Sequence, residues 1–166
     1  IDAGVFSLII GFILVIMFMF IKYRIFGLVS NISLIANLFM MVGILTMIEA
    51  TLTLPGIAGI ILTVGMAVDS NVLIYERIKE ELKTEKSIIH AFDTGYNKAK
   101  ITVIDANVTT LIAAAILFIF GSGPVKGFAV TLGIGIVTTL FSAYFIARHL
   151  TSVIVLNDKN GKYFKL

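Results

Sequence analysis

The sequence predicts an all-α membrane protein, a bundle of five transmembrane helices. Of its 166 residues, 58% are hydrophobic and 14% are charged, whereas a soluble domain has about half apolar and about a quarter charged residues. The mean hydropathy is +1.04. The apolar residues gather in stretches of about 20 residues, the length that crosses a bilayer as a helix. These stretches are 4–21, 26–48, 54–75, 101–120 and 127–147.

The connections between these stretches are mostly short. Lys22-Tyr23-Arg24 joins the first two, and so short a turn predicts an antiparallel hairpin. Glycine and proline interrupt helices, and they predict two more tight turns at 51–55 and 121–124.

The long connection 77–100 is polar, but six apolar residues recur in it at helical spacing. These residues are Ile78, Leu82, Ile88, Ile89, Phe92 and Tyr96. The pattern predicts an amphipathic cytoplasmic connection whose helices lie at the membrane surface. We expect one transmembrane domain, 1–150, followed by a short cytoplasmic C-terminal tail, 151–166.

Positive charge is distributed very unevenly across the predicted membrane. Of the 13 Lys and Arg residues, Lys126 alone falls on one side. Basic loops stay in the cytoplasm, so the N-terminus is predicted to be periplasmic and the C-terminus cytoplasmic. The net charge of +3 is then a topology signal, and we expect no nucleic-acid partner. Because the chain begins at Ile1 without a signal peptide, we expect a fragment of a longer protein.

Asp69 is the most informative single residue, because it lies inside the third apolar stretch. At about 1.5 Å per residue it lies about 10 Å from the polar Glu76. An ionised carboxylate is costly at that depth unless it is partnered or hydrated, so such an acid can take up and release a proton. Gly65, one turn earlier, leaves room for a close helix or a water path. Asp69 is our candidate proton relay; the alternative is a permanently neutral Asp hydrogen-bonded to a neighbouring helix.

The fourth stretch begins with polar residues that are candidates to support Asp69. Positions 106, 107, 110, 113 and 114 form a small or polar face, which favours tight packing against the helix of Asp69. We expect Asn107, Thr109 and Thr110 to relay hydrogen bonds to Asp69 or its water. Packing between helices is the alternative role. Asp105 lies near the start of its helix, where the helix dipole favours a carboxylate, so we expect a structural role for it.

The remaining polar residues give no sign of catalysis or metal binding. Glu49 is expected at the outer end of the second span as a solvated acid. His90 and His149 have no partner at ligand spacing, and the chain contains no cysteine, so no metal site is predicted. We find no Ser-His-Asp arrangement, phosphate-binding glycine loop or HExxH motif, and we expect a protein that is not an enzyme.

Several longer motifs resemble one known family. They are YRIFGLV at 23–29, TLTLPGIAG at 51–59, GMAVDSNVLIYERIKEE at 65–81, DANVTTLI at 105–112 and GSGPVKGFAVTL at 121–132. Together they resemble the SecD/SecF family of protein-export membrane proteins, within the resistance-nodulation-division (RND) superfamily. The resemblance extends from about Gly4 to Arg148. Ser70 and Tyr75 depart from the family, which often has Ala and Phe at these positions.

The resemblance implies a fold and a role. The fold is an incomplete six-helix RND-type bundle that lacks the family's first membrane helix and periplasmic domain. The role is to use the proton-motive force with SecF, in the bacterial inner membrane, to drive late translocation of polypeptides through SecYEG. Implied partners are SecF, the SecYEG translocon, the translocating polypeptide and the lipid bilayer, with YajC as a further candidate. Protons are the coupling ion and no cofactor is implied. By residue match Asp69 is the family's intramembrane carboxylate, and we expect its counter-charge from SecF.

Two other functions remain open from the sequence. One is a structural scaffold that anchors SecF and SecYEG without proton chemistry. The other is a small-molecule or lipid exporter of the same superfamily.

Overall fold

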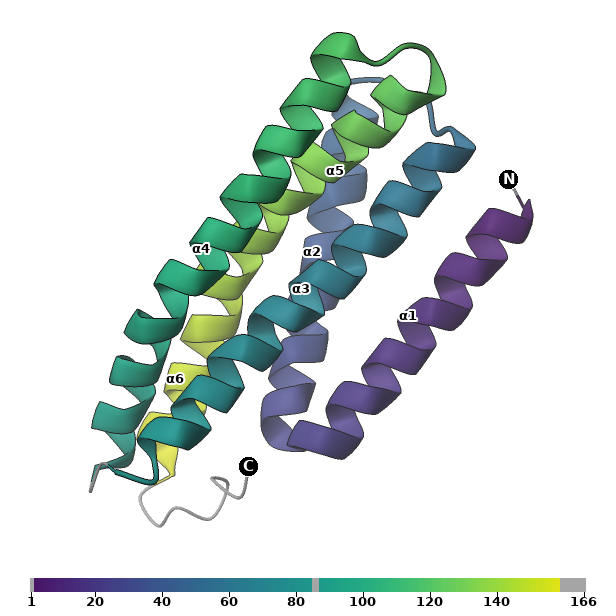
Figure 1. The fold of residues 1–166 in the computed structure, drawn as a ribbon. Coiled ribbons are helices and arrows are strands. Elements are labelled where there is room, and N and C mark those ends of the chain that lie inside the picture. The colour runs from purple at the N-terminus through teal and green to yellow at the C-terminus, as the bar shows by residue number, and fades with distance from the viewer. Residues whose placement is uncertain (1, 85–86, 159–166) are drawn as a thin grey trace.

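The computed structural model describes residues 2–84 and 87–158, which form a bundle of long helices without strands (Figure 1). The helices are α1 (Asp2–Tyr23), α2 (Ile25–Met47), α3 (Leu54–Glu81), α4 (Ile88–Phe120) and α5 (Pro124–Phe141). A π-helical segment, η1 (Ser142–Ala147), continues α5 directly into α6 (Arg148–Asn157). Five segments of this part of the chain are long and apolar enough to cross a membrane. Each predicted span matches one of them to within one residue at either end, or lies inside it, which confirms the five-helix bundle.

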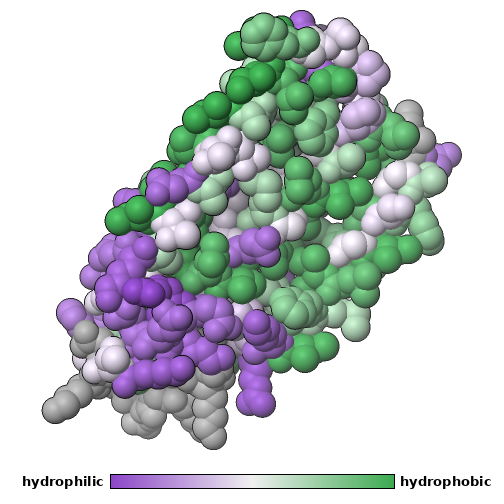
Figure 2. Space-filling model, in the orientation of Figure 1, coloured by the Kyte–Doolittle hydropathy of each residue, from purple (hydrophilic) through white to green (hydrophobic). Residues whose placement is uncertain are grey.

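Hydrophilic residues gather at one end of the bundle, and apolar residues cover most of the rest of the face shown in Figure 2. We call this the basic end. It holds the α1–α2 turn, the end of α3, the start of α4 and α6. α3 lies between the other helices and contacts α1, α2, α4 and α5. The largest buried cluster lies toward the basic end, where Tyr23, Tyr75 and Tyr96 are at most 1% exposed.

The structure corrects our expectation for the long connection. α3 continues to Glu81 and α4 begins at Ile88, so the connection consists mainly of the extended ends of two bundle helices. Ile78, Phe92 and Tyr96 are buried in the core instead of resting on the membrane surface. Helical periodicity reveals an apolar face, but it does not distinguish a cover of lipid from a cover of neighbouring helices.

The predicted boundary at residue 150 also falls inside a helix. α6 extends the last span to Asn157 and buries Thr151 and Val155. The later part of the tail, with Lys159, Lys162 and Lys165, lies outside the described residues.

The predicted hairpin between α1 and α2 is confirmed, and its turn is very tight. Arg24 has a φ of 50°, in the left-handed region that non-glycine residues seldom adopt. Three residues later, Gly27 lies directly against the backbone of α1. A Cβ atom at Gly27 would overlap the carbonyl oxygen of Met19. The absence of a side chain therefore allows the two helices to meet at the turn.

Replacing Gly27 with alanine is expected to destabilise the protein by about 1–3 kcal/mol, because the obstructing atom belongs to a backbone that cannot rotate away. The measurement is the unfolding midpoint of the detergent-solubilised protein. Gly43→Ala is the matched control on the same helix, because nothing lies within 4 Å of a Cβ atom there. Equal midpoints for the two variants would contradict this account of the turn.

The last turn of α5 and the π-helical segment pack against α2 through a buried polar seam. The Ser33 hydroxyl donates to the carbonyl of Ser142 at 3.1 Å, and Asn37 Nδ2 donates to Thr139 Oγ1 at 3.1 Å. All four residues are at most 3% exposed. A π-helical turn displaces the regular ladder of backbone hydrogen bonds. The bond from Ser33 gives a carbonyl in this segment a partner from another helix.

Candidate proton site on the open face of α3

Asp69 lies near the middle of α3, on a face that the other described helices leave open. Its side chain is exposed, as are Leu62 (46%) and Leu73 (45%) on the same face. Val68 and Ser70, its neighbours in sequence, are 6% and 4% exposed. α3 therefore buries one side in the bundle and presents Asp69 on the other.

The depth of Asp69 in a membrane stays a prediction, and the structure gives its position along α3. α3 has 28 residues, about 42 Å at 1.5 Å per residue, and is therefore longer than the hydrocarbon core of about 30 Å. Asp69 lies about 18 Å from Glu81 at the basic end. Asp69 thus lies about three turns of α3 away from Glu81.

The expected hydrogen bonds from α4 to Asp69 are not formed in this structure. Thr109 and Thr110 donate to carbonyls of their own helix, those of Asp105 at 2.9 Å and Ala106 at 3.1 Å. Asn107 Nδ2 likewise donates to the Val103 carbonyl at 2.7 Å. Within 2–84 and 87–158, no hydrogen bond or ion pair reaches the Asp69 carboxylate, so any partner of this acid must come from elsewhere.

The predicted small or polar face of α4 is divided between the inside and the outside of the bundle. Asn107 and Ala114 are each 3% exposed, and the Oδ1 atom of Asn107 has no hydrogen-bond partner among the described residues. Ala106 and Ala113 are exposed. Asp105 is exposed too, near the middle of the long α4 and not near its start, because α4 begins at Ile88. The helix-dipole reason for a carboxylate at Asp105 therefore does not hold.

Gly65 adds open space beside Asp69. Nothing lies within 4 Å of where its Cβ atom would be. Helix faces that combine small residues with a polar group favour association of helices in membranes. An ionisable group that faces lipid is costly. The face around Asp69 therefore has the properties of a surface covered by another protein or by water.

Ion pairs and hydrogen bonds at the basic end link helices that are distant in sequence. Tyr23 donates to Glu76 at 2.8 Å, joining α1 to α3. Lys98 pairs with Glu81 at 2.8 Å, joining α4 to α3. No local sequence pattern predicts these pairs. Acids and bases near both ends of the 77–100 connection were the available signal, but their spacing does not specify which acid will pair with which base.

The other residues considered from sequence lie away from Asp69. Glu49 is exposed at the end of α2 and has a φ of 52°. His90 and His149 are exposed on α4 and α6. The described residues contain no group of three or more His, Cys, Asp or Glu that could hold a metal ion.

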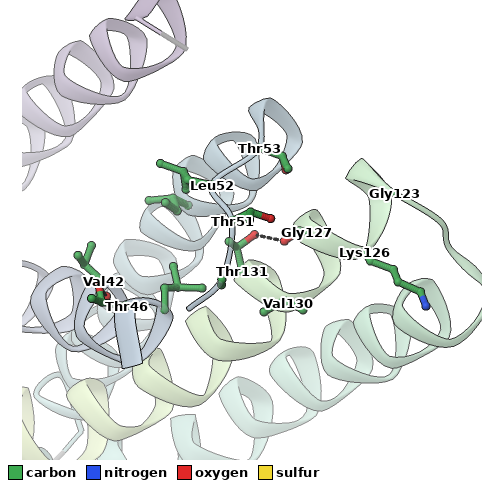
Figure 3. Close-up of a pocket in the computed structure, with 13 residues that line it drawn as sticks. Val42, Thr46, Thr51, Leu52, Thr53, Gly123, Lys126, Gly127, Val130 and Thr131 are labelled. Carbon is green, nitrogen blue, oxygen red and sulfur yellow. Dashed lines mark hydrogen bonds between the residues drawn. The ribbon is translucent and has the colours of Figure 1, made fainter. Parts of the chain in front are cut away.

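A cavity of about 380 Å³ lies at the end of the bundle opposite the basic end, between the α2–α3 turn and the start of α5 (Figure 3). Thr53 and Thr131 line it, and Thr131 donates to the Gly127 carbonyl at 3.1 Å. The Lys126 side chain turns away from the cavity in Figure 3 and its ammonium lies 5.7 Å from the centre of the Phe118 ring. Among the side chains drawn in Figure 3, hydroxyl groups line the cavity and no charged group points into it.

A family model described as "Protein export membrane protein SecD/SecF, C-terminal" matches residues 1–157. The chain belongs to the SecD/SecF family. Two relatives are named "Protein translocase subunit SecD". The one from Magnetococcus marinus is 51% identical over 156 residues, which are 94% of this chain and 30% of the relative. The one from Rickettsia prowazekii is 53% identical over 165 residues, 99% of this chain and 31% of the relative.

Solved SecDF structures show the same arrangement of helices. SecDF from Thermus thermophilus, described as a translocon-associated membrane protein, matches with a TM-score of 0.88 and 43% identity, over 92% of this chain and 21% of that chain. A SecDF structure in a super-membrane-facing form matches with a TM-score of 0.87. These matches confirm the family resemblance found in the sequence, and the chain is a multi-pass membrane protein. It spans about three tenths of the length of the SecD relatives described above.

Proposed function

We propose that this chain is the membrane part of a protein-export subunit that uses the proton-motive force to drive late translocation of polypeptides through SecYEG. The observation that carries the proposal is the exposed Asp69 carboxylate near the middle of α3, in a chain whose relatives are SecD translocase subunits. Protons are the coupling ion. The chain carries out no covalent chemistry in this proposal.

Asp69 alternates between a protonated and an ionised form. The neutral acid suits an apolar contact, whereas the ionised acid requires water or a positive partner. Protonation of Asp69 therefore changes how well the exposed face of α3 packs against whatever protein covers it. A proton that crosses 100 mV releases about 2.3 kcal/mol, enough to shift a two-state equilibrium about fiftyfold.

The cover of the open face and the counter-charge of Asp69 are assigned to SecF in this proposal. Gly65 and the exposed alanines of α4 allow another helix to approach closely. The described residues supply no partner to Asp69, and the similar solved structures are of SecDF. YajC and SecYEG are assigned to other surfaces of the complete protein.

The basic end faces the cytoplasm of a bacterial inner membrane in this proposal, because the Lys and Arg residues of the described part, except Lys126, lie toward it. The start of α1 and the α4–α5 turn then face the periplasm. A proton entering from that side moves down the gradient to Asp69 and leaves toward the basic end.

The test uses inner-membrane vesicles in which a polypeptide has been halted midway through SecYEG. Vesicles with and without the protein are compared with the proton gradient imposed and with the gradient collapsed by an uncoupler. We expect the gradient to speed completion of export only when the protein is present. An equal response to the gradient in vesicles that lack the protein would overturn the proposal.

A further inference from the structure

A groove of about 790 Å³ lies at the basic end, between the first turns of α4 and the η1–α6 segment. Its walls are both polar and apolar. Ile89 on α4 and Phe145 and Leu156 on the other side line it, and these three side chains are 54%, 65% and 60% exposed. The groove therefore lies open on the outside of the bundle, next to the boundary between its polar end and its apolar surface.

Two opposite charges lie inside this groove. Asp93 and Arg148 line it together with the imidazoles of His90 and His149, and no other Asp, Glu, Lys or Arg of the described residues does. Arg148 donates to Asp93 at 3.3 Å. The two side chains nevertheless stay 59% (Asp93) and 40% (Arg148) exposed, so each retains room for a further partner.

Neighbouring residues hold this pair in position. The Arg148 guanidinium lies 5.6 Å from the centre of the Tyr96 ring, within the range of a cation–π interaction. Asn97 Nδ2 donates to the second carboxylate oxygen of Asp93 at 3.4 Å. The charges are therefore supported from α4, and a bound group meets a preformed acid and base.

An apolar row continues from the groove toward the middle of the membrane. Val137, Phe141 and Phe145 are separated by four residues each and are 56%, 47% and 65% exposed. The rings of Phe141 and Phe145 stack with 4.9 Å between their centres. The surface thus offers charge at the membrane boundary and a hydrocarbon contact leading away from it.

We propose that this groove binds a membrane phospholipid with an ethanolamine head group. Arg148 donates to the phosphate and Asp93 accepts from the ammonium, while an acyl chain lies along Phe145 and Phe141. One acid and one base match a zwitterionic head group. An anionic lipid would leave Asp93 beside a like charge, and a choline group has no N–H to donate to the carboxylate. This inference requires only that the chain lies in a membrane, and it is independent of the proton chemistry of Asp69.

The test measures the lipids retained by the intact protein in native mass spectrometry, after equilibration with equal amounts of phosphatidylethanolamine, phosphatidylcholine and phosphatidylglycerol of matched acyl chains. We expect about tenfold preferential retention of phosphatidylethanolamine, the ratio that corresponds to about 1.4 kcal/mol. Asp93→Asn is expected to shift the preference to phosphatidylglycerol, because Arg148 then has no opposing charge. Arg148→Gln is expected to lower retention of all three lipids.

Glu80→Gln is the matched control for Asp93→Asn. Glu80 is also an acid at the basic end that pairs with an arginine, and its side chain is 62% exposed, but it does not line the groove. We expect this variant to keep the original preference. Equal retention of the three lipids, a preference of the unchanged protein for phosphatidylglycerol, or the same shift in Glu80→Gln would each overturn the inference. A gain of phosphatidylglycerol in Asp93→Asn cannot arise from a protein that has merely unfolded.

Discussion

Replacing Asp69 with asparagine is expected to abolish the gradient-dependent part of polypeptide export while leaving the protein folded in the membrane. Asparagine keeps the size and the hydrogen-bonding groups of a neutral acid but cannot release a proton. Because the side chain is exposed and no hydrogen bond or ion pair of the described residues reaches it, little stability should be lost. The acceleration of export by the gradient, up to about fiftyfold for one charge crossing 100 mV, should disappear in the vesicle assay.

Two variants serve as controls for this prediction. Asp69→Glu keeps a titratable acid and should retain part of the gradient response. Glu80→Gln neutralises an exposed acid on the same helix near the basic end, and its response should equal that of the unchanged protein. If Asp69→Asn responds normally to the gradient and still co-purifies with SecF, the region acts as a scaffold and the relay is excluded.

Replacing Gly135 with valine is expected to produce the largest loss of stability, about 3 kcal/mol, at the upper end of typical overpacking costs. Gly135 on α5 faces Thr63 on α3, and a Cβ atom there would overlap the Thr63 side chain and lie 2.8 Å from its Cβ. Thr63 has no room to move, because it is 0% exposed and its hydroxyl donates to the Gly59 carbonyl at 2.9 Å. Overpacking of this kind forces the helices apart.

The control for this variant is Gly133→Val on the same helix, where nothing lies within 4 Å of the added Cβ atom. Unfolding of both variants is followed by circular dichroism in mixed detergent micelles of increasing denaturing strength. Gly135→Val should unfold well before the unchanged protein, and Gly133→Val close to it. A Gly135→Val protein as stable as Gly133→Val would show that α3 and α5 are less closely packed than described.

The helices were predictable because a bilayer imposes a simple requirement of length and apolarity. Which face of each helix points into the bundle could not be predicted, because lipid and protein interior are both apolar in a membrane. Phe145 is 65% exposed and Ile136 is 0% exposed, yet both read as hydrophobic positions in the same span. For the same reason the apolar residues of the 77–100 connection indicated a surface helix, whereas Ile78 and Tyr96 are buried in the core.

Asp69 stands out in the sequence as a candidate because one charge inside an apolar stretch is a strong local signal. Its surroundings could not be identified, because they depend on how α3 and α4 rotate about their axes. Thr109 and Thr110 have the right chemistry for a relay, but their hydroxyls bond within α4. Asp93 and Arg148 are separated by 55 positions. The sequence around either residue therefore does not indicate that the two will pair.

The six residues Ser142–Ala147 wind more loosely than the helices on either side of them. An α-helix advances by about 100° per residue. Rewinding these six residues as a regular α-helix, without changing their number, would therefore turn everything beyond them further around the axis. Thr151 would leave its buried place and Arg148 would point away from Asp93. The angular setting of the final ten-residue helix, and with it the meeting of two distant charges, thus depends on one locally relaxed turn in the interior of the last span.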